Sequence, residues 1–453
     1  EGVSIFVDRG VPGDYAVLEL YDVRKDFAHA RIVDLIEPSS MRHEPPCKLF
    51  KLCGGCQWQH VIYDKQLELK TDIVKQVMKH IAGLNPEIVL PAFGAEYPLN
   101  YRNKVQFPVA SPKNSTRILA GYYKEGSHEL VNIKHCPVQP ELLDYVLESA
   151  KYAAEDVGFS AYEEKGHSGL LRHIVARYSF SHDQALVTLV LNAQPSELEG
   201  LQSSLGRLAR QLMKEVPPVL GVCVNFNPNR GNRIMGNNTV LIAGQDFIIE
   251  KLSSRHGAAP KILRDGLQFQ LSPLSFFQVN SEQAVTLMDM VLDAVMDFCK
   301  KREIQRVPLI LDAFAGVASI ALWVAPLAEN VIAVEEVQAA VSDSEKIMRL
   351  NGISNVEARC GTVEAVFPQL LEEGKQPQIV ILDPPRKGVD KDALLCIAKL
   401  SPDRIIYVSC NPATLARDLK ILTENGYEAK SVRPVDLFPQ TYHVESVTVL
   451  DKV

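Results

Sequence analysis

Several features that would assign a protein to a class at once are missing from this chain of 453 residues. It contains no run of 18 or more apolar residues, which argues against a transmembrane helix. Its first residues, Glu1-Gly2-Val3-Ser4, lack the basic and apolar stretches that open a secretory signal. Its nine cysteines form no even framework of the kind that disulfide-rich secreted proteins carry. We therefore predict a cytoplasmic protein, monomeric and without a membrane partner.

An excess of positive charge is also lacking. The chain has 48 lysines and arginines against 55 aspartates and glutamates, and its formal net charge is −7. Nucleic-acid-binding proteins usually show a basic footprint, which the chain as a whole does not have. Residues 100–136, however, hold six basic residues and only two acids. This segment either contacts phosphates or forms an ordinary solvated hairpin, and its charge alone does not decide between them.

The length predicts two or three domains, since a single core rarely organises 453 residues. Residues 1–40 contain three short strands separated by turns, which is typical of a small β-barrel. Residues 41–270 begin with a Cys- and Gly-rich stretch and continue with mostly strand-like segments. From residue 271 to residue 453, buried β-branched runs alternate with helices. That alternation predicts an α/β fold with a doubly wound, Rossmann-like sheet.

A nucleotide-type pocket is predicted at the start of this last domain. The buried strand Leu309–Phe314 runs into a turn of small residues around Gly316, and a helix follows. Such a turn lets backbone amides approach a ligand at the carboxyl edge of the sheet. Glu335 ends the next strand, where an acid is the expected partner of ribose hydroxyls. The turn lacks the G-x-G-x-x-G pattern of dinucleotide folds, which argues against a dehydrogenase.

Two further strands end in residues that can carry chemistry. Ile379–Asp383 ends in a carboxylate followed by two prolines, and Arg404–Val408 leads to Cys410 and a helix. Both side chains are expected at the same edge of the sheet. A thiol close to a helix N-terminus is expected to have a depressed pKa and a populated thiolate. The alternative is a small buried cysteine without chemistry.

The segments Leu382-Asp383-Pro384-Pro385-Arg386, Val408–Asp418 and Phe438–Glu445 resemble the signatures of the RNA (uracil-5-)-methyltransferase family. The resemblance extends through nearly the whole chain and is greatest to the iron–sulfur branch that acts on 23S ribosomal RNA. It implies a transfer of methyl from S-adenosylmethionine to C5 of a uridine, with transfer RNA as the alternative substrate. It also implies a TRAM-like RNA-binding barrel at residues 1–40, a cluster-bearing domain at 41–270 and the methyltransferase domain at 271–453.

The same resemblance assigns roles to individual residues. Cys410 adds to C6 of the uracil ring, which makes C5 nucleophilic, and Glu445 removes the proton from C5. The residues expected to hold the methyl donor are Gln278, Phe314, Gly316, Ser319, Glu335, Thr362 and Asp383. Two positions depart from the family pattern. Ala318 stands where the family has glycine, so its methyl group is expected to crowd the donor. Thr362 stands where the family has Asp or Asn, so a weaker contact is expected.

Four cysteines have a spacing that suits a metal. Cys47, Cys53 and Cys56 lie close together in the sequence, and Cys136 follows eighty residues later. Four thiolates suit a [4Fe–4S] cluster or structural zinc, and the spacing alone leaves both open. The family resemblance favours the iron–sulfur cluster. The C-x3-C-x2-C spacing of radical enzymes is absent, so a structural or RNA-organising cluster is expected.

RNA contacts are predicted at Tyr101–Lys104 and the basic hairpin after it. Phe107, Tyr122 and Tyr123 either stack on bases or belong to the core. Three other functions remain open on the sequence. They are methylation of a base amino group through Asp383-Pro384-Pro385, RNA binding without catalysis, and electron transfer by an iron–sulfur cluster.

Overall fold

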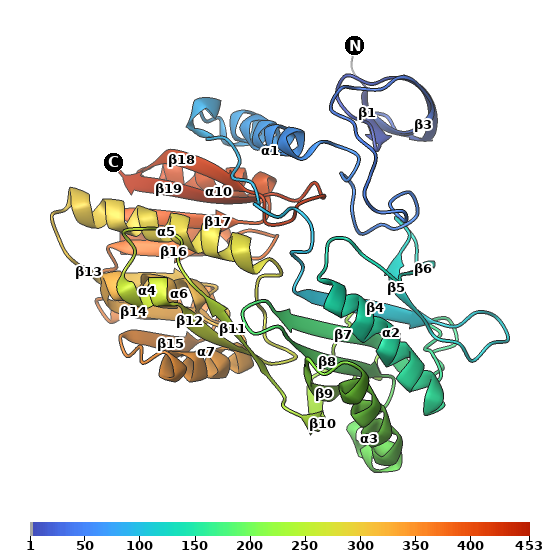
Figure 1. Ribbon diagram of the computed structural model, residues 1–453. Helices are drawn as coiled ribbons and strands as arrows, with labels where there is room; N and C mark the ends of the chain where they lie inside the picture. The colour runs from blue at the N-terminus through green and yellow to red at the C-terminus, as the bar shows by residue number, and fades with distance from the viewer. Residues whose placement is uncertain (1–2) are drawn as a thin grey trace.

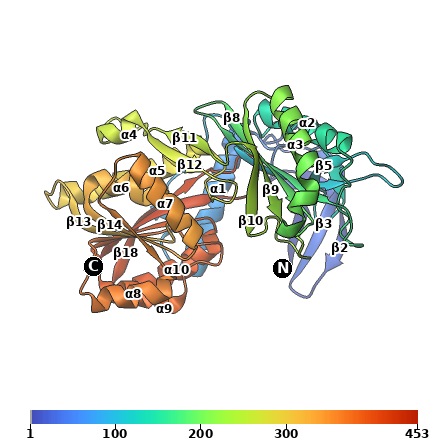
Figure 2. The same cartoon turned by 90° about the horizontal axis from the view of Figure 1, so that it is seen from below.

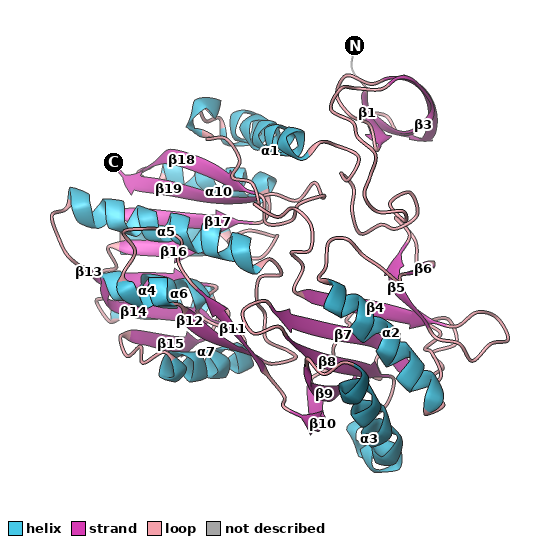
Figure 3. Ribbon diagram, in the orientation of Figure 1, coloured by secondary structure: helices cyan, strands magenta, loops and turns pink. Residues whose placement is uncertain are grey.

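The computed structural model describes residues 3–453. They form a three-stranded sheet, two seven-stranded sheets, a two-stranded hairpin and the helices that cover them (Figures 1 and 3). The first unit is a three-stranded sheet in the order β1-β3-β2. Its strands are β1 (Ser4–Asp8), β2 (Tyr15–Val23) and β3 (Phe27–Glu37), which confirms the strands predicted at these positions. The outer strands β1 and β2 do not pair with each other, so these strands form an open sheet and not a closed barrel.

The second unit is a seven-stranded sheet in the order β10-β9-β8-β7-β4-β5-β6. Its strands are β4 (Lys104–Ala110), β5 (Leu119–Tyr123), β6 (Leu130–Asn132), β7 (Leu171–Ser179), β8 (Gln184–Leu191), β9 (Val219–Phe226) and β10 (Asn238–Gly244). Helices α2 (Glu141–Asp156) and α3 (Leu198–Glu215) cover one face of it (Figure 2). Side chains alternate across a strand, so the other face of this sheet is left for contacts outside the unit.

Two segments between the units pack against the third unit or lead into it. Helix α1 (Tyr63–Val77) ends in a π-helical turn at Met78–Ala82, and its apolar side packs on the C-terminal sheet layer. Within α1, Lys70 is fully buried and pairs with Asp436 at 2.5 Å. Separating this pair would leave a buried charge without its partner, which costs free energy. The contact therefore favours one position of α1 on the third unit. The hairpin β11 (Ile248–Leu252) and β12 (Leu267–Leu271), with α4 (Lys261–Asp265) between its strands, leads into the last unit.

The last unit is a doubly wound α/β sheet in the order β15-β14-β13-β16-β17-β19-β18. Its first five strands in this order pair in parallel and its last two pair antiparallel. The strands are β13 (Val307–Ala313), β14 (Ala328–Glu335), β15 (Val356–Cys360), β16 (Ile379–Leu382), β17 (Arg404–Ser409), β18 (Tyr427–Val435) and β19 (Glu445–Lys452). The predicted Rossmann-like sheet is therefore confirmed.

Helices cover both faces of this sheet (Figure 2). One layer holds α5 (Ser281–Lys301), α6 (Ser319–Val324) and α7 (Gln338–Leu350), and the other holds α8 (Val363–Glu372), α9 (Lys391–Leu400) and α10 (Pro412–Glu424). Asn280 caps α5 by accepting the N–H of Gln283 at 3.2 Å, and asparagine is one of the residues that favour this position. Among residues 3–453, none of the helices has the length and apolar character needed to cross a membrane.

Candidate active site

A cavity of about 1410 Å³ lies between the open face of the central sheet and the carboxyl ends of the C-terminal parallel strands. All nine residues predicted for catalysis or donor binding line it. They are Gln278, Phe314, Gly316, Ser319, Glu335, Thr362, Asp383, Cys410 and Glu445. The parallel strands end at one edge, which explains why residues far apart in sequence meet there. The structure thus brings the predicted residues together, while their individual roles stay predictions.

The turn after β13 forms one wall of this cavity. Phe314, Gly316 and Ala318 all have positive φ angles of 57–64°, a conformation that costs free energy in the two residues with a side chain. Glu335 holds the turn, because one carboxylate oxygen accepts the N–H of Gly316 and the other accepts that of Val337, both at 2.9 Å. The carboxylate of Glu335 thus holds this turn in place on one side of the cavity. There is open space beside Gly316, where an added Cβ would meet no atom within 4 Å.

The two departures from the family pattern have different outcomes. The side chain of Ala318 is 1% exposed, belongs to the apolar core and does not line the cavity. The expectation that its methyl group crowds the donor is therefore wrong, because this residue turns its side chain away from the cavity. Thr362 does line the cavity and caps α8 through a 3.3 Å contact from the N–H of Ala365.

Three strand ends bring the chemical groups together. Asp383 follows β16, Cys410 follows β17, and Glu445 is the first residue of β19. Strand β19 runs antiparallel to β17 with Ser446 opposite Ser409, so Glu445 and Cys410 lie at the same edge. The side chain of Asn411 links the loops that follow β16 and β17. Its carbonyl oxygen accepts the N–H of Ala413, and its amide donates to the carbonyl oxygen of Arg386.

Burial and like charge raise the pKa values of the acids at this corner. Glu445 is 5% exposed, and burial together with the Asp383 carboxylate raises its pKa to about 8. Burial raises the pKa of Asp383 to about 7. The nearby guanidinium of Arg386 lowers the pKa of Glu445 but does not offset the burial. Perturbed acids in a cavity are typical of a catalytic site.

The expected depression of the Cys410 pKa is wrong. Burial, followed by the carboxylates of Glu445 and Asp383, raises the pKa of this thiol to about 11. Although Cys410 lies two residues before the start of α10, two carboxylates and the loss of solvent outweigh the helix terminus. In the free protein the sulfur is therefore a protonated thiol at neutral pH.

Three residues near the site were not predicted to take part in it. Arg386 and His443 face each other, with 3.4 Å between the guanidinium and the imidazole, and both line the cavity. Asp312 lies beneath it, 1% exposed, with one carboxylate oxygen on the N–H of Ala321 and the other without a hydrogen-bond partner among the described residues. Arg386 and His443 lie inside the quoted motifs, whereas no sequence signal distinguishes Asp312 from an ordinary strand residue.

Comparisons with known proteins support one family. The family model described as tRNA (Uracil-5-)-methyltransferase matches residues 237–453. An uncharacterized RNA methyltransferase of Halalkalibacterium halodurans is 36% identical over 451 residues, which is 100% of this chain and 93% of the relative. Another, of Gloeobacter violaceus, is 37% identical over 452 residues and is covered to 92%. The chain belongs to the RNA (uracil-5-)-methyltransferase family.

A solved structure agrees with this family membership. The chain of Pyrococcus abyssi tRNA (uracil-54, C5)-methyltransferase, crystallised with S-adenosyl-L-homocysteine, superposes on this methyltransferase with a TM-score of 0.74 at 25% identity. The match covers 99% of this chain and 95% of the other. The three units of this methyltransferase are therefore arranged as in a solved family member.

The cysteine segment of the methyltransferase lies outside the cavity. Cys136 is buried, and Cys53 and Cys56 pack against the same small apolar cluster. Cys53 and Cys47 both raise the pKa of Cys56, so the sulfurs are neighbours. Within residues 3–453, however, no three His, Cys, Asp or Glu side chains stand at the spacing that a metal ion needs. The predicted metal site is therefore present as a neighbourhood of thiols, and not as a formed ligand set.

The strand residues of the predicted RNA-contacting segment of the methyltransferase are mostly interior, whereas its hairpin loop at 111–117 and Tyr123 are exposed. Tyr101, Asn103 and Phe107 are 6%, 2% and 1% exposed, and Phe107 packs on Tyr122 with ring centroids 5.1 Å apart. These side chains are core, so they do not stack on RNA bases. Lys104 is the exception, because its side chain lines the cavity.

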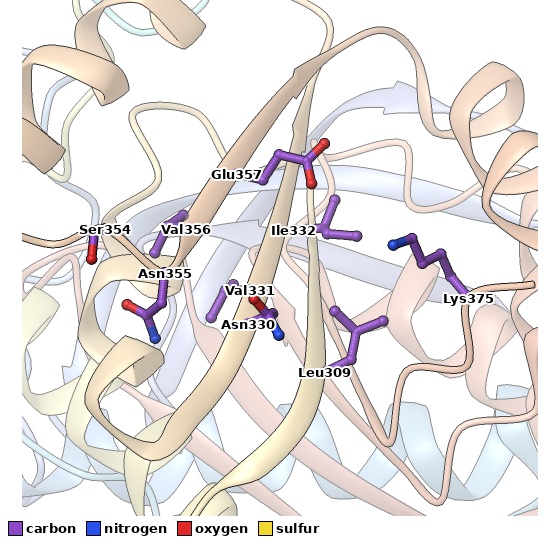
Figure 4. Close-up of a pocket in the computed structure, with 9 residues that line it drawn as sticks. All are labelled: Leu309, Asn330, Val331, Ile332, Ser354, Asn355, Val356, Glu357 and Lys375. Atoms are coloured by element: carbon purple, nitrogen blue, oxygen red, sulfur yellow. The ribbon is translucent and has the colours of Figure 1, made fainter. Parts of the chain in front are cut away.

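A second, smaller cavity of about 290 Å³ opens near the amino ends of β13, β14 and β15 (Figure 4). Asn330, Asn355 and Glu357 contribute polar atoms to its wall, and none of the predicted site residues lines it. The amide nitrogen of Asn355 already donates to the backbone carbonyls of Ala325 and Ala328. This cavity is therefore remote from the chemistry of the first one.

Proposed function

We propose that this protein transfers a methyl group from S-adenosylmethionine to C5 of a uridine in RNA, through a covalent bond between Cys410 and C6 of the base. The observation that carries the proposal is the meeting of Cys410, Asp383 and Glu445 in the same cavity as the residues expected to hold the donor. The family membership and the S-adenosyl-L-homocysteine in the P. abyssi structure support the choice of donor.

The residues of the donor half fit S-adenosylmethionine. Open space beside Gly316 leaves room for the ligand, and the Glu335 carboxylate keeps free lone pairs for ribose hydroxyls after accepting its two N–H groups. Gln278, Phe314, Ser319, Thr362 and Asp383 would complete this half. When bound, S-adenosylmethionine supplies an electrophilic methyl group on a cationic sulfur.

The protein's own side chains would perform two proton movements. As Cys410 forms its bond to C6, its thiol proton passes to the carboxylate of Asp383, which leaves Glu445 ionised. The electrons then available at C5 make that carbon the nucleophile. After methylation, Glu445 in its ionised form takes the proton from C5, the C5–C6 double bond returns, and the bond between sulfur and C6 breaks. The departing thiolate recovers its proton from Asp383, and the C5 proton passes from Glu445 to solvent.

The target base must leave its RNA fold to reach Cys410, because the cavity admits only an extruded nucleotide. We propose 23S ribosomal RNA as the substrate, on the motifs that resemble the cluster-bearing branch. Transfer RNA is the second candidate, and the name of the P. abyssi neighbour favours it. Mass spectrometric mapping of 5-methyluridine in both RNA classes, with and without the gene, distinguishes them. A uridine that regains its methyl group only when the gene is restored identifies the substrate.

The covalent step has a direct test in RNA that carries 5-fluorouridine, because fluorine at C5 cannot leave as a proton. Wild-type protein with this RNA and S-adenosylmethionine should give a protein–RNA adduct that survives denaturation, and Cys410→Ala should give none. Cys396→Ala, which removes a thiol in α9 outside the cavity, should form the adduct as the wild type does. Methyl transfer to uridine by Cys410→Ala would overturn the proposal and favour a reaction that needs no nucleophile.

We also propose that Cys47, Cys53, Cys56 and Cys136 hold a [4Fe–4S] cluster. Three of the four thiols, those of Cys53, Cys56 and Cys136, lie on one apolar cluster, and the N–H of Gly55 already donates to the sulfur of Cys53 at 3.4 Å. The sulfurs would draw together on binding. Iron and sulfide analysis of anaerobically purified protein, with Cys56→Ala as the variant, tests the assignment. Stoichiometric zinc without iron would overturn it.

We infer that the chain divides into units at 1–40, 41–270 and 271–453, with the first acting as a TRAM-like RNA-binding module. The open three-stranded sheet and the two seven-stranded sheets support this division. Limited proteolysis should cut first near these boundaries, and first cuts inside the two large sheets would contradict it.

A further inference from the structure

The cavity has a second half that the proposed chemistry does not use. Lys104 and Gln106 line it from β4, and Asn232, Arg233 and Asn237 line it from the loop 228–237 between β9 and β10. In β4, Lys104 and Gln106 point to the cavity, while the alternating Val105 and Phe107 point into the core of the central unit. The sheet's open face therefore builds this half of the cavity.

The loop 228–237 is held at its base by buried polar side chains. Asn225 donates to the carbonyl oxygen of Gly236 at 3.0 Å and accepts the N–H of Gly236 at 2.6 Å. Asn227 donates to the carbonyl oxygens of Arg233 and Ile234 at 2.6 and 2.9 Å. Both asparagines are at most 2% exposed. Buried amides this fully paired rigidify a loop, so the loop side chains are presented in a fixed place.

The loop presents cationic and amide groups without a neutralising acid. Residues 228–237 contain Arg230 and Arg233 and no Asp or Glu. The guanidinium of Arg233 donates to the side-chain oxygen of Asn237 at 2.6 Å, which orients it but leaves its charge unpaired. Among the ion pairs of the described residues, none involves Arg233. An oriented guanidinium of this kind suits a phosphate oxygen.

Strands β4 and β7, which lie beside the loop, also contribute no carboxylate. Lys104 stands opposite Arg177 in the β4–β7 register, and Arg177 is 2% exposed with two of its nitrogens unpaired within residues 3–453. Burial, Arg177 and Arg102 lower the pKa of Lys104 to about 7. On this half of the cavity wall, Asp246 is the one carboxylate against Lys104 and Arg233.

We propose that the loop 228–237 and Lys104 bind the RNA strand next to the target uridine, with Arg233 on a backbone phosphate. The cavity of about 1410 Å³ exceeds the roughly 300–1,000 Å³ of an ordinary small-molecule pocket, so it has room for more than a methyl donor. This inference rests on the proposed function, since it takes the occupant of the cavity to be RNA. It assigns the central sheet to strand binding and the C-terminal sheet to chemistry.

The test is the salt dependence of RNA binding. Phosphate contacts do not depend on sequence, so a fluorescein-labelled single-stranded RNA 12-mer of mixed sequence is a suitable probe, followed by fluorescence anisotropy between 50 and 200 mM salt. Arg233→Gln should weaken binding and reduce the slope of log affinity against log salt by about 0.7, the value for one phosphate contact on a single strand. The deficit of the variant should therefore shrink about 2.6-fold across this fourfold range of salt.

Arg230→Gln is the matched control. It removes the same charge from the same exposed loop, but Arg230 does not line the cavity. If Arg233→Gln and Arg230→Gln have the same salt slope, the inference is overturned. Asn227→Ala keeps every charge and should weaken binding without changing the slope, because it only loosens the loop. Equal melting temperatures and unchanged binding of S-adenosylhomocysteine show that a variant is folded.

The design separates this inference from the proposed function. If wild-type protein forms the 5-fluorouridine adduct but Arg233→Gln binds RNA as the wild type does, only the inference fails. If the Arg233-dependent slope is found while no adduct and no methyl transfer occur, the proposed function fails and the strand-binding loop stands.

Discussion

Raising the pH from 7 to 9 should accelerate the loss of the C5 proton from uridine about tenfold. Burial and the Asp383 carboxylate raise the pKa of Glu445 to about 8. At that pKa about one tenth of Glu445 is ionised at pH 7 and about nine tenths at pH 9. Only the carboxylate form accepts a proton, so the rate rises as the pH rises through 8 and falls on the acid side.

The assay is the single-turnover release of tritium from RNA labelled at C5 of uridine, at saturating RNA and S-adenosylmethionine. Arg386→Gln should displace the profile to higher pH, because this guanidinium lowers the pKa values of both Glu445 and Cys410. Arg386→Lys keeps the charge and should displace it less. Glu445→Gln should release no tritium and should accumulate a methylated protein–RNA adduct. A release rate that is constant from pH 7 to 9, in a protein equally stable at both, would refute the assignment of Glu445 as the base.

Two further predictions concern stability, measured by urea denaturation. Lys70→Met should lower the free energy of unfolding by about 3–5 kcal/mol, because it leaves the fully buried Asp436 without its cation, and the double variant with Asp436→Leu should recover most of that loss. Tyr407→Phe should cost about 1–3 kcal/mol, because the hydroxyl donates to the buried Asp418 carboxylate at 2.6 Å, and an unchanged midpoint would contradict this.

Local sequence signals predict the C-terminal sheet well. Strands such as Val356–Cys360 and the capped helix that begins after Asn280 follow from periodicity and capping, which depend on neighbours in the chain. Helix α8 is not predicted by the same signals, because it is short and contains Pro368, which normally argues against a helix. Strand ends could be placed at one edge of the sheet because parallel strands share a direction.

The half of the cavity formed by the central sheet could not be predicted, because it depends on how two units pack. The basic residues 100–136 fit either a phosphate contact or a solvated hairpin, and strand alternation and burial decide which of them reaches the cavity. That residue is Lys104. Arg233 lies outside the basic segment altogether. The Asn-rich sequence 225–238 is the one signal, since paired buried asparagines are typical of a shaped loop.

The pKa of Cys410 is raised, although its position before a helix predicts a lowered pKa. Residue type and helix position are therefore not enough to predict whether a cysteine is ionised. A helix N-terminus contributes about 0.3–1 kcal/mol, which is less than one pKa unit. At Cys410 it competes with burial and with two carboxylates contributed by strands β16 and β19. The acids that raise this pKa are also the groups able to accept the thiol proton, so a site that held a permanent thiolate would need them to be absent. The neighbouring acids therefore keep the thiol neutral in the free protein, and under the proposed mechanism the same acids accept its proton when the sulfur attacks.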